Sequence, residues 1–153
     1  MANFSQTCKI TYQMFSLWCQ LLRQEANNRG IDPRRIFFTA HLSTQQHLNR
    51  FKQADLVVDT YPYGGHTLTS DALWAGTPVV TMMGETFASR VAASLLMNVG
   101  MGELVVHNDE EFFKITNTML HQCEQLSTWR QYLDNGRSMG GRFKCKPTEN
   151  AHI

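Results

Sequence analysis

The sequence predicts an α/β domain in which a parallel β-sheet is flanked by helices. Short runs rich in β-branched residues alternate with segments whose apolar residues recur at helical spacing, an order typical of parallel sheets with helices on both faces. The chain has 153 residues, of which 42% are hydrophobic. This is enough for one domain, or one lobe of a larger protein, with a core of its own.

Apolar spacing, capping signals and glycines set the elements that we expect along the chain. The expected order is helix Tyr12–Glu25, strand Arg35–Ala40, helix Ser43–Ala54, strand Asp55–Thr60, helix Thr67–Ala75, strand Pro78–Met82, helix Thr86–Asn98, strand Glu103–Val106 and helix Asp109–Leu120 with a continuation to about Asn135. We expect residues 1–135 to form the folded lobe. Residues 136–153 lack periodicity and are expected to form an irregular tail.

Charge and cysteine usage exclude several classes of partner. Lys and Arg total 14 against 13 Asp and Glu, so the net charge of +1 gives no basic field for nucleic acid or an anionic membrane. The four cysteines lack metal-site spacing, which argues against a zinc site or a disulfide framework and favours a reducing compartment. With no apolar signal segment or membrane-length apolar run, we expect a soluble intracellular chain.

A glycine-rich turn, "YGGHTLTSD", follows the expected strand Asp55–Thr60 and opens the next helix. Ligands of open parallel sheets bind beyond the carboxyl ends of the strands, where this turn must lie. Gly64 and Gly65 allow a sharp turn and a close approach to a ligand, and the helix start that follows suits a phosphate. Thr67 and Asp71 share one helix face, on which the carboxylate can accept hydrogen bonds from ribose hydroxyls. The alternative is structural, with Thr67 as an N-cap and Asp71 as a favourable first-turn acid.

His47 and Arg50 form a second candidate pair on the expected helix Ser43–Ala54. They lie three residues apart on one edge, which we place away from Leu48 and Phe51. An imidazole can stack on or hydrogen-bond a base, and a guanidinium can pair with phosphate. Judged alone, a solvated polar edge is the simpler interpretation of this pair.

The glycine turn belongs to a longer pattern, "GGHTLTSDALWAGTPVVTMMGETFASRVAASLLMNVGMGELV". The pattern resembles the C-terminal lobe of the protein O-GlcNAc transferases, in which GHTT is followed by D-x-LWAGTP-x-VT-x-PGET-x-ASRVA-x-S. The resemblance extends upstream through "QADLVVDTYPYGGHT", the helix of His47 and Arg50, "RIFF" and "NFSQTCKI". It covers most of residues 3–106.

The resemblance implies the C-terminal lobe of a B-type (GT-B) glycosyltransferase fold, which is Rossmann-like and binds UDP-N-acetylglucosamine in a cleft between two lobes. It implies transfer of N-acetylglucosamine to Ser or Thr hydroxyls of proteins in the cytoplasm and nucleus, with inversion and with no cofactor or required metal. It also implies an N-terminal catalytic lobe and tetratricopeptide repeats, for which we find no counterpart in this sequence.

The resemblance also assigns roles to residues of both candidate groups. His47 is similar to the histidine that packs on the uracil, and Arg50 to an arginine near the nucleotide one turn along the same helix. His66 and Thr67 match the pair that holds the diphosphate. Asp71 matches the acid that binds the ribose.

Gln6 and Lys9, which judged alone are ordinary surface residues, match residues near the phosphates. Lys9 is implied to be catalytic, because a fixed cation stabilises the negative charge on the departing UDP. Three positions depart from the family pattern: the second GHTT threonine is Leu68, a lysine before the uracil histidine is Thr44, and the proline of PGET is Met83. These departures leave one hydroxyl contact and one cationic or backbone-shaping contact in question.

The segment between Cys19 and Gly30 is shorter than the family pattern, which has an apolar strand and a further helix there. This predicts a truncated sheet that lacks a strand.

Three functional classes stay open at this point. The first is the nucleotide-sugar-binding lobe of an O-GlcNAc transferase, with a related variant that uses GDP-fucose, as the SPINDLY-type O-fucosyltransferases do. The second is a nucleotide-binding module without activity of its own, and the third is a degraded α/β domain kept for interaction. The matched site residues argue against the third class. A transferase needs both sides of its cleft, which argues against autonomous catalysis by this lobe.

Overall fold

The computed structural model describes residues 12–39 and 42–138, which divide into two compact units. Residues 44–138 belong to the larger unit, and the described residues before 44 belong to the smaller one. Every candidate site residue that the structure describes lies in the larger unit.

The larger unit is built on a parallel sheet of three strands in the order β1-β2-β3. The strands are β1 (Val57–Val58), β2 (Val79–Met82) and β3 (Val105–Val106). Val57 pairs with Val79, and Thr81 pairs with Val105. The first three residues of β2 are fully buried, as expected for the central strand of a parallel sheet that is covered on both faces.

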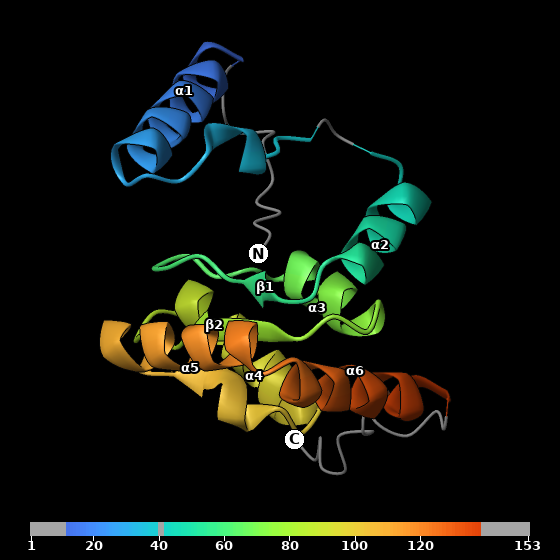
Figure 1. Ribbon diagram of the computed structural model, residues 1–153. Helices are drawn as coiled ribbons and strands as arrows, with labels where there is room; N and C mark the ends of the chain where they lie inside the picture. Colours follow the sequence, from blue (N-terminus) through green and yellow to red (C-terminus); the bar gives the residue numbers. More distant parts are fainter. Residues whose placement is uncertain (1–11, 40–41, 139–153) are drawn as a thin grey trace, which may run out of the picture. The chain divides into compact units, whose positions relative to one another are not determined.

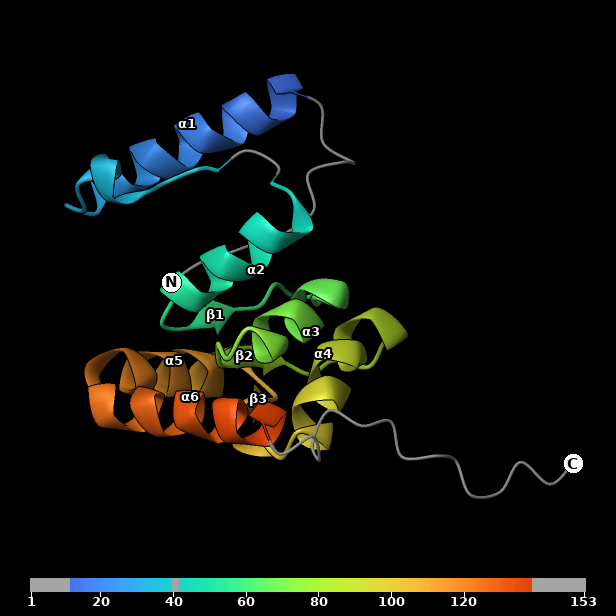
Figure 2. The same ribbon diagram turned by 90° about the vertical axis from the view of Figure 1, so that its right-hand side faces the viewer.

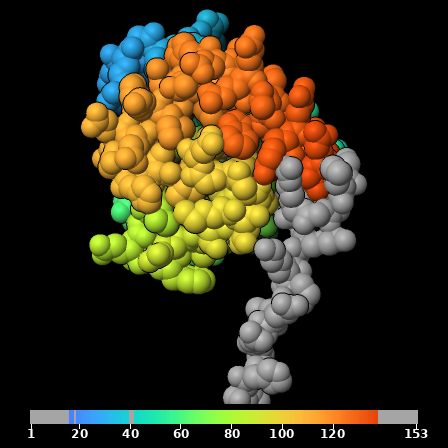
Figure 3. Space-filling view, turned by 90° about the horizontal axis from the view of Figure 1, so that it is seen from below, coloured from blue at the N-terminus to red at the C-terminus, as the bar shows by residue number. Residues whose placement is uncertain are grey.

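Helices cover both faces of the sheet, which confirms the predicted α/β class. The helices of this unit are α2 (Thr44–Gln53), α3 (Thr67–Trp74), α4 (Phe87–Asn98), α5 (Asp109–His121) and α6 (Cys123–Ser138). β2 lies between α3 and α4 on one side and α5 on the other (Figure 1, Figure 2). α2 packs on α3, while α6 packs on both α3 and α5. On the face in Figure 3, the yellow residues of α4 and the orange residues of α5 and α6 lie side by side.

Local sequence signals explain where these helices begin and end. The Thr86 hydroxyl caps α4 by accepting a hydrogen bond from the N–H of Ser89, and the Asn108 side chain caps α5 in the same way. Gly76 and Gly100 follow α3 and α4 with φ of 87° and 78°, conformations that glycine adopts at little cost. Each of these glycines therefore ends its helix, and the chain turns back toward the sheet.

One continuous core fills the larger unit. It draws its largest fully buried apolar side chains from α2, α3, α4, α6, β2 and the connecting segments: Phe51, Leu56, Leu73, Val79, Val80, Leu96, Met101, Leu104 and Leu133. The apolar periodicity that predicts the helices therefore also identifies the faces that pack together. Ala72 and Ala75 are buried and Leu68 is half-buried, so this side of α3 packs against the core.

The structure corrects three of the expected elements. The expected strand Glu103–Val106 is shortened to β3, because Gly102–Leu104 forms a 3-10 helix in front of it. The expected strand Arg35–Ala40 is wrong: Pro33–Arg35 forms a short 3-10 helix, and residues 36–39 are not assigned to a strand. Asp32 stabilises the 3-10 turn by accepting a hydrogen bond from the N–H of Arg34, and the described residues supply no neighbouring strand for the segment that follows. The expected last helix is two helices, α5 and α6, separated at Gln122. α6 continues to Ser138, beyond the expected boundary at residue 135.

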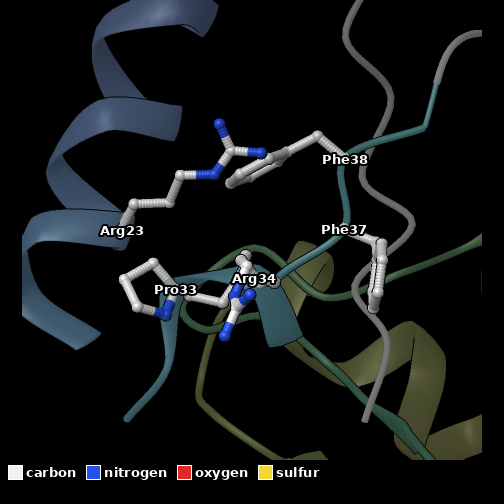
Figure 4. A pocket seen from close by; sticks show the side chains of 6 residues that line it. Arg23, Pro33, Arg34, Phe37 and Phe38 are labelled. Atoms are coloured by element: carbon white, nitrogen blue, oxygen red, sulfur yellow. The ribbon is translucent and has the colours of Figure 1, made fainter. Parts of the chain in front are cut away.

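The smaller unit consists of α1 (Tyr12–Asn28), the 3-10 helix and the segment after it. The family pattern has a strand between the positions of Cys19 and Gly30, but in this chain α1 occupies that region. This agrees with the prediction that the sheet lacks a strand. A pocket of about 520 Å³ lies within this unit, and in Figure 4 the Arg23 guanidinium lies beside the ring of Phe38, 5.3 Å from its centroid. In the two described ranges, no helix combines the length and the apolar character needed to cross a membrane.

Candidate functional site

The loops after β1 and β2 meet at the carboxyl edge of the sheet. The loop after β1 leads into α3, and the loop after β2 leads into α4, so two helix N-termini point to this edge. The N–H of Gly64 donates a hydrogen bond of 3.1 Å to the carbonyl of Ala88, which joins the first loop to the start of α4. Backbone N–H groups of a first helical turn lack intrahelical acceptors, so this edge offers donors and partial positive charge to an anion.

Asp59 holds the glycine turn in place. Its Oδ1 accepts hydrogen bonds from the backbone N–H groups of Thr60 at 2.9 Å and Gly65 at 2.7 Å, while its Oδ2 accepts one of 2.7 Å from the Thr81 hydroxyl. One carboxylate thereby ties both ends of the loop to the central strand. The sequence interpretation missed Asp59, although an acid directly between a strand and a Gly-Gly turn is a signal that could have found it.

Gly64 and Gly65 are required by crowding around the turn. A Cβ at Gly65 would lie 2.7 Å from the Thr69 hydroxyl oxygen, and one at Gly64 would lie 3.0 Å from Asp59 Oδ2 and 3.3 Å from the carbonyl of Ala88. Neither glycine has a positive φ. The close approach expected of these glycines is therefore an approach to the protein's own atoms.

His66 and Thr67 stand at the start of α3, with His66 as the N-cap and Thr67 as the first helical residue. The structural alternative that made Thr67 the N-cap is therefore wrong. The His66 side chain makes no capping hydrogen bond; its Nε2 lies 3.4 Å from the carbonyl oxygen of Ala88. Its ring stacks on Tyr63 at 5.4 Å and meets the edge of Phe87 at 6.0 Å between centroids. The Thr67 residue is exposed at the same edge.

The packing of α2 on α3 brings His47, Arg50 and Asp71 together. Arg50 Nη2 lies 2.8 Å from His47 Nδ1, and His47 Nε2 lies 3.8 Å from Asp71 Oδ2. A guanidinium has donors only, so Nδ1 is the acceptor in its bond with Arg50 and the ring proton of a neutral imidazole resides on Nε2. That proton faces the carboxylate of Asp71. A base-binding candidate, a cation and a ribose-binding candidate thus form one connected group.

The surroundings of His47 and Arg50 differ from a solvated helix edge. The His47 side chain is only 17% exposed, and its ring meets Phe51 at 4.7 Å in an edge-to-face contact. The expectation that this pair lies away from Phe51 is wrong for His47, because residues four apart on a helix are neighbours. Partial burial also lowers the pKa of the Arg50 guanidinium from its ordinary value, although the group remains charged at neutral pH.

The remaining site expectations divide in two. Gln6 and Lys9 lie outside the described residues. Leu68 and Met83, two of the departures from the family pattern, are half-buried and pack against the core, so their apolar side chains have a structural role. Among the described residues, no group of three or more His, Cys, Asp or Glu side chains is placed to hold a metal ion.

Comparisons by sequence and by structure find relatives of the same kind. A profile of glycosyl transferase family 41 matches residues 20–151. A Caenorhabditis elegans UDP-N-acetylglucosamine–peptide N-acetylglucosaminyltransferase is 32% identical over 165 residues, covering 94% of this chain and 14% of the relative. The Arabidopsis thaliana protein SPINDLY, named as a probable UDP-N-acetylglucosamine–peptide N-acetylglucosaminyltransferase, is 28% identical over 156 residues, covering 86% of this chain and 17% of the relative.

A solved structure supports the fold independently. A mutant of the Thermobaculum terrenum O-GlcNAc transferase superposes with a TM-score of 0.73 and 30% sequence identity, covering 79% of this chain and 23% of that one. The chain therefore spans less than a quarter of each of these relatives. With a family profile that matches most of its length and a structural neighbour of the same kind, the chain belongs to glycosyl transferase family 41.

Proposed function

We propose that this chain is the nucleotide-sugar-binding lobe of a protein O-GlcNAc transferase, which transfers N-acetylglucosamine from UDP-N-acetylglucosamine to Ser or Thr hydroxyls of cytoplasmic and nuclear proteins. The observation that carries the proposal is the convergence of His47, Arg50 and Asp71, from two helices, one turn along α3 from His66 and Thr67. The family relationship supplies the class of donor and acceptor.

The geometry suits the parts of a uridine diphosphate in sequence. The half-buried His47 ring, braced by Phe51 and Arg50, provides a flat surface for the base. Asp71 is 31% exposed and can accept hydrogen bonds from ribose hydroxyls. The start of α3, with His66 and Thr67, provides hydrogen-bond donors for the diphosphate.

The catalytic step is assigned to Lys9, with Gln6 as a further contact to the phosphates. As the acceptor hydroxyl displaces UDP with inversion, negative charge grows on the leaving phosphate, and a fixed ammonium group stabilises that charge. The proposed reaction requires neither a cofactor nor a metal ion. An N-terminal catalytic lobe supplies the other side of the cleft, and tetratricopeptide repeats select the acceptor proteins.

A second candidate is transfer of fucose from GDP-fucose. It follows from the resemblance to the SPINDLY-type O-fucosyltransferases, and a SPINDLY relative, itself named as a probable UDP-N-acetylglucosamine–peptide N-acetylglucosaminyltransferase, covers 86% of this chain. A third is a catalytically inactive nucleotide-binding or interaction fragment.

Transfer assays test the proposal. The chain is combined with the separately produced N-terminal part of the Caenorhabditis elegans relative and supplied with UDP-N-acetylglucosamine or GDP-fucose and an acceptor peptide. We expect transfer from the UDP-sugar, and we expect Lys9→Ala to abolish it while Lys114→Ala, an exposed lysine of α5, leaves it unchanged. Full activity of Lys9→Ala would remove Lys9 from the mechanism.

A further inference from the structure

α6 carries none of the candidate site residues, yet its Arg130 binds the end of α2. Arg130 Nη1 donates a hydrogen bond of 2.8 Å to the carbonyl of Ala54, and Nη2 donates one of 2.7 Å to the carbonyl of Lys52. The side chain is 31% exposed. A cation on the last carbonyls of a helix satisfies acceptors that have no intrahelical donor and opposes the negative end of the helix dipole. Arg130 thus fixes the C-terminal end of α2.

Arg137 makes the equivalent contact with α3. Its Nη1 donates a hydrogen bond of 2.8 Å to the carbonyl of Trp74, the last residue of α3. Its Nη2 donates one of 2.6 Å to Oδ1 of Asp134, which orients the guanidinium. The Arg137 side chain is 33% exposed, so water competes with these charge-assisted bonds only in part.

Both arginines project from one side of α6, because they are seven residues apart, or about two helical turns. Leu133 lies between them in the sequence and is only 2% exposed, and Leu126, one turn before Arg130, is 8% exposed. The buried leucines anchor α6 in the core. From this fixed position the two arginines reach the ends of two different helices.

We propose that Arg130 and Arg137 are positioning residues, which hold α2 and α3 so that His47, Arg50 and Asp71 meet in the geometry that binds the nucleotide. The inference rests on the proposed function of these three residues. On this proposal α6 stabilises the relative positions of α2 and α3 without contacting the ligand itself.

The short distance along each helix between the site residues and the carbonyls bound by the arginines supports this role. Arg50 lies two residues before Lys52, and Asp71 lies three residues before Trp74, so both are within one turn of a carbonyl that an arginine binds. His47 lies five residues before Lys52, between one and two turns away. Over one turn a helix is rigid, and a displacement of its end moves the site residue by a similar amount. The contact between His47 Nε2 and Asp71 Oδ2 crosses from α2 to α3 and therefore depends on both clamps.

The test uses the full chain with Arg130→Met and Arg137→Met, which keep the aliphatic stem and remove the guanidinium. Two quantities are measured at a temperature at which each variant is folded by circular dichroism. The first is the Kd for UDP by calorimetry. The second is the pair of imidazole 15N resonances of His47, which report the bonds of Nδ1 and Nε2 and need no nucleotide.

Matched controls separate positioning from general stability. Lys114→Met removes an exposed cation from α5, and Leu126→Ala destabilises α6 through the core without touching α2 or α3 carbonyls. Arg137→Lys keeps a cation near the carbonyl of Trp74 and is expected to restore part of the lost affinity. We expect each arginine-to-methionine variant to raise the Kd for UDP by about two- to tenfold and to shift the His47 resonances.

The outcomes are distinct. The proposal is overturned if Arg130→Met and Arg137→Met both leave the affinity for UDP unchanged. It is also overturned if Leu126→Ala changes the affinity and the His47 resonances as much as these two variants do. A wild-type chain that does not bind UDP would refute the proposed function instead. In that case the His47 resonances alone test the positioning role. If they are unchanged in both arginine-to-methionine variants, the positioning role is refuted.

Discussion

His47 Nε2 lies 3.8 Å from Asp71 Oδ2, and this contact links the helix before β1 to the helix after it. On its other side, His47 receives a hydrogen bond at Nδ1 from Arg50. The imidazole is therefore held between a permanent cation and a carboxylate. Its two nitrogens have unequal roles, which has a direct spectroscopic consequence.

We predict that His47 is in the Nε2–H tautomer. The Arg50 guanidinium can only donate, so the Nδ1 atom of His47 must carry the lone pair. The 15N spectrum of the side chain at neutral pH should show an unprotonated Nδ1 and a protonated Nε2. Arg50→Met should abolish this preference. A protonated Nδ1 in the wild-type chain would contradict the arrangement of this group.

Asp71→Ala is expected to weaken UDP binding by about 1–3 kcal/mol, the range for loss of a hydrogen bond to a charged group. Asp71 is only 31% exposed and its carboxylate faces the candidate site. Glu103→Ala is the control, because Glu103 is exposed and lies before β3, at the opposite edge of the sheet. Calorimetric titration of both alanine variants measures the effect. Equal affinities for wild-type and Asp71→Ala would return Asp71 to a structural role.

Asp59→Ala should destabilise the glycine turn by about 1–3 kcal/mol, because two backbone N–H groups and one hydroxyl lose their acceptor. Asp59→Asn is expected to lower the free energy of unfolding by less than half of this amount. Its amide oxygen can accept from the Gly65 N–H and its amide nitrogen can donate to the Thr81 oxygen. Urea unfolding of the two variants gives the free energies. A larger loss for Asn than for Ala would refute the proposed hydrogen-bond pattern.

Gly65→Ala should cost about 1–3 kcal/mol of stability, because its Cβ would overlap the buried Thr69 side chain. Gly102→Ala is the matched control. A Cβ there meets only Met97 Cγ at 3.9 Å, an ordinary contact. Thermal unfolding of both variants compares the two sites, and equal melting temperatures would show that the turn tolerates a side chain.

The alternation of patterns in the sequence predicts the sheet class and the helices, because apolar spacing and capping residues act locally. The same reasoning fails at Arg35–Ala40, where a high β-propensity is not enough to make a strand. A strand also needs a partner that supplies its hydrogen bonds, and propensity carries no information about that partner.

The candidate site shows a similar division. The types and spacing of Thr67 and Asp71 after the glycine turn point to an anion and ribose site, whereas the role of His66 is implied by the family resemblance. The structure places His47 between Arg50 and Asp71, a contact that the spacing within one helix does not predict. The contacts of Asp59 with Thr81, and of Arg130 with Ala54, join residues far apart in the sequence. No local pattern predicts such contacts. The roles of Gln6 and Lys9 stay predictions.

Calorimetric titration of the purified chain with UDP, with GDP as the comparison, tests the central claim most directly. We predict saturable binding of UDP, weaker binding of GDP, and a marked loss of affinity when His47 and Asp71 are both replaced by alanine. Selective binding of GDP would favour the fucose donor. A chain that is folded by circular dichroism and binds neither nucleotide would contradict the claim that this lobe is a nucleotide-sugar site.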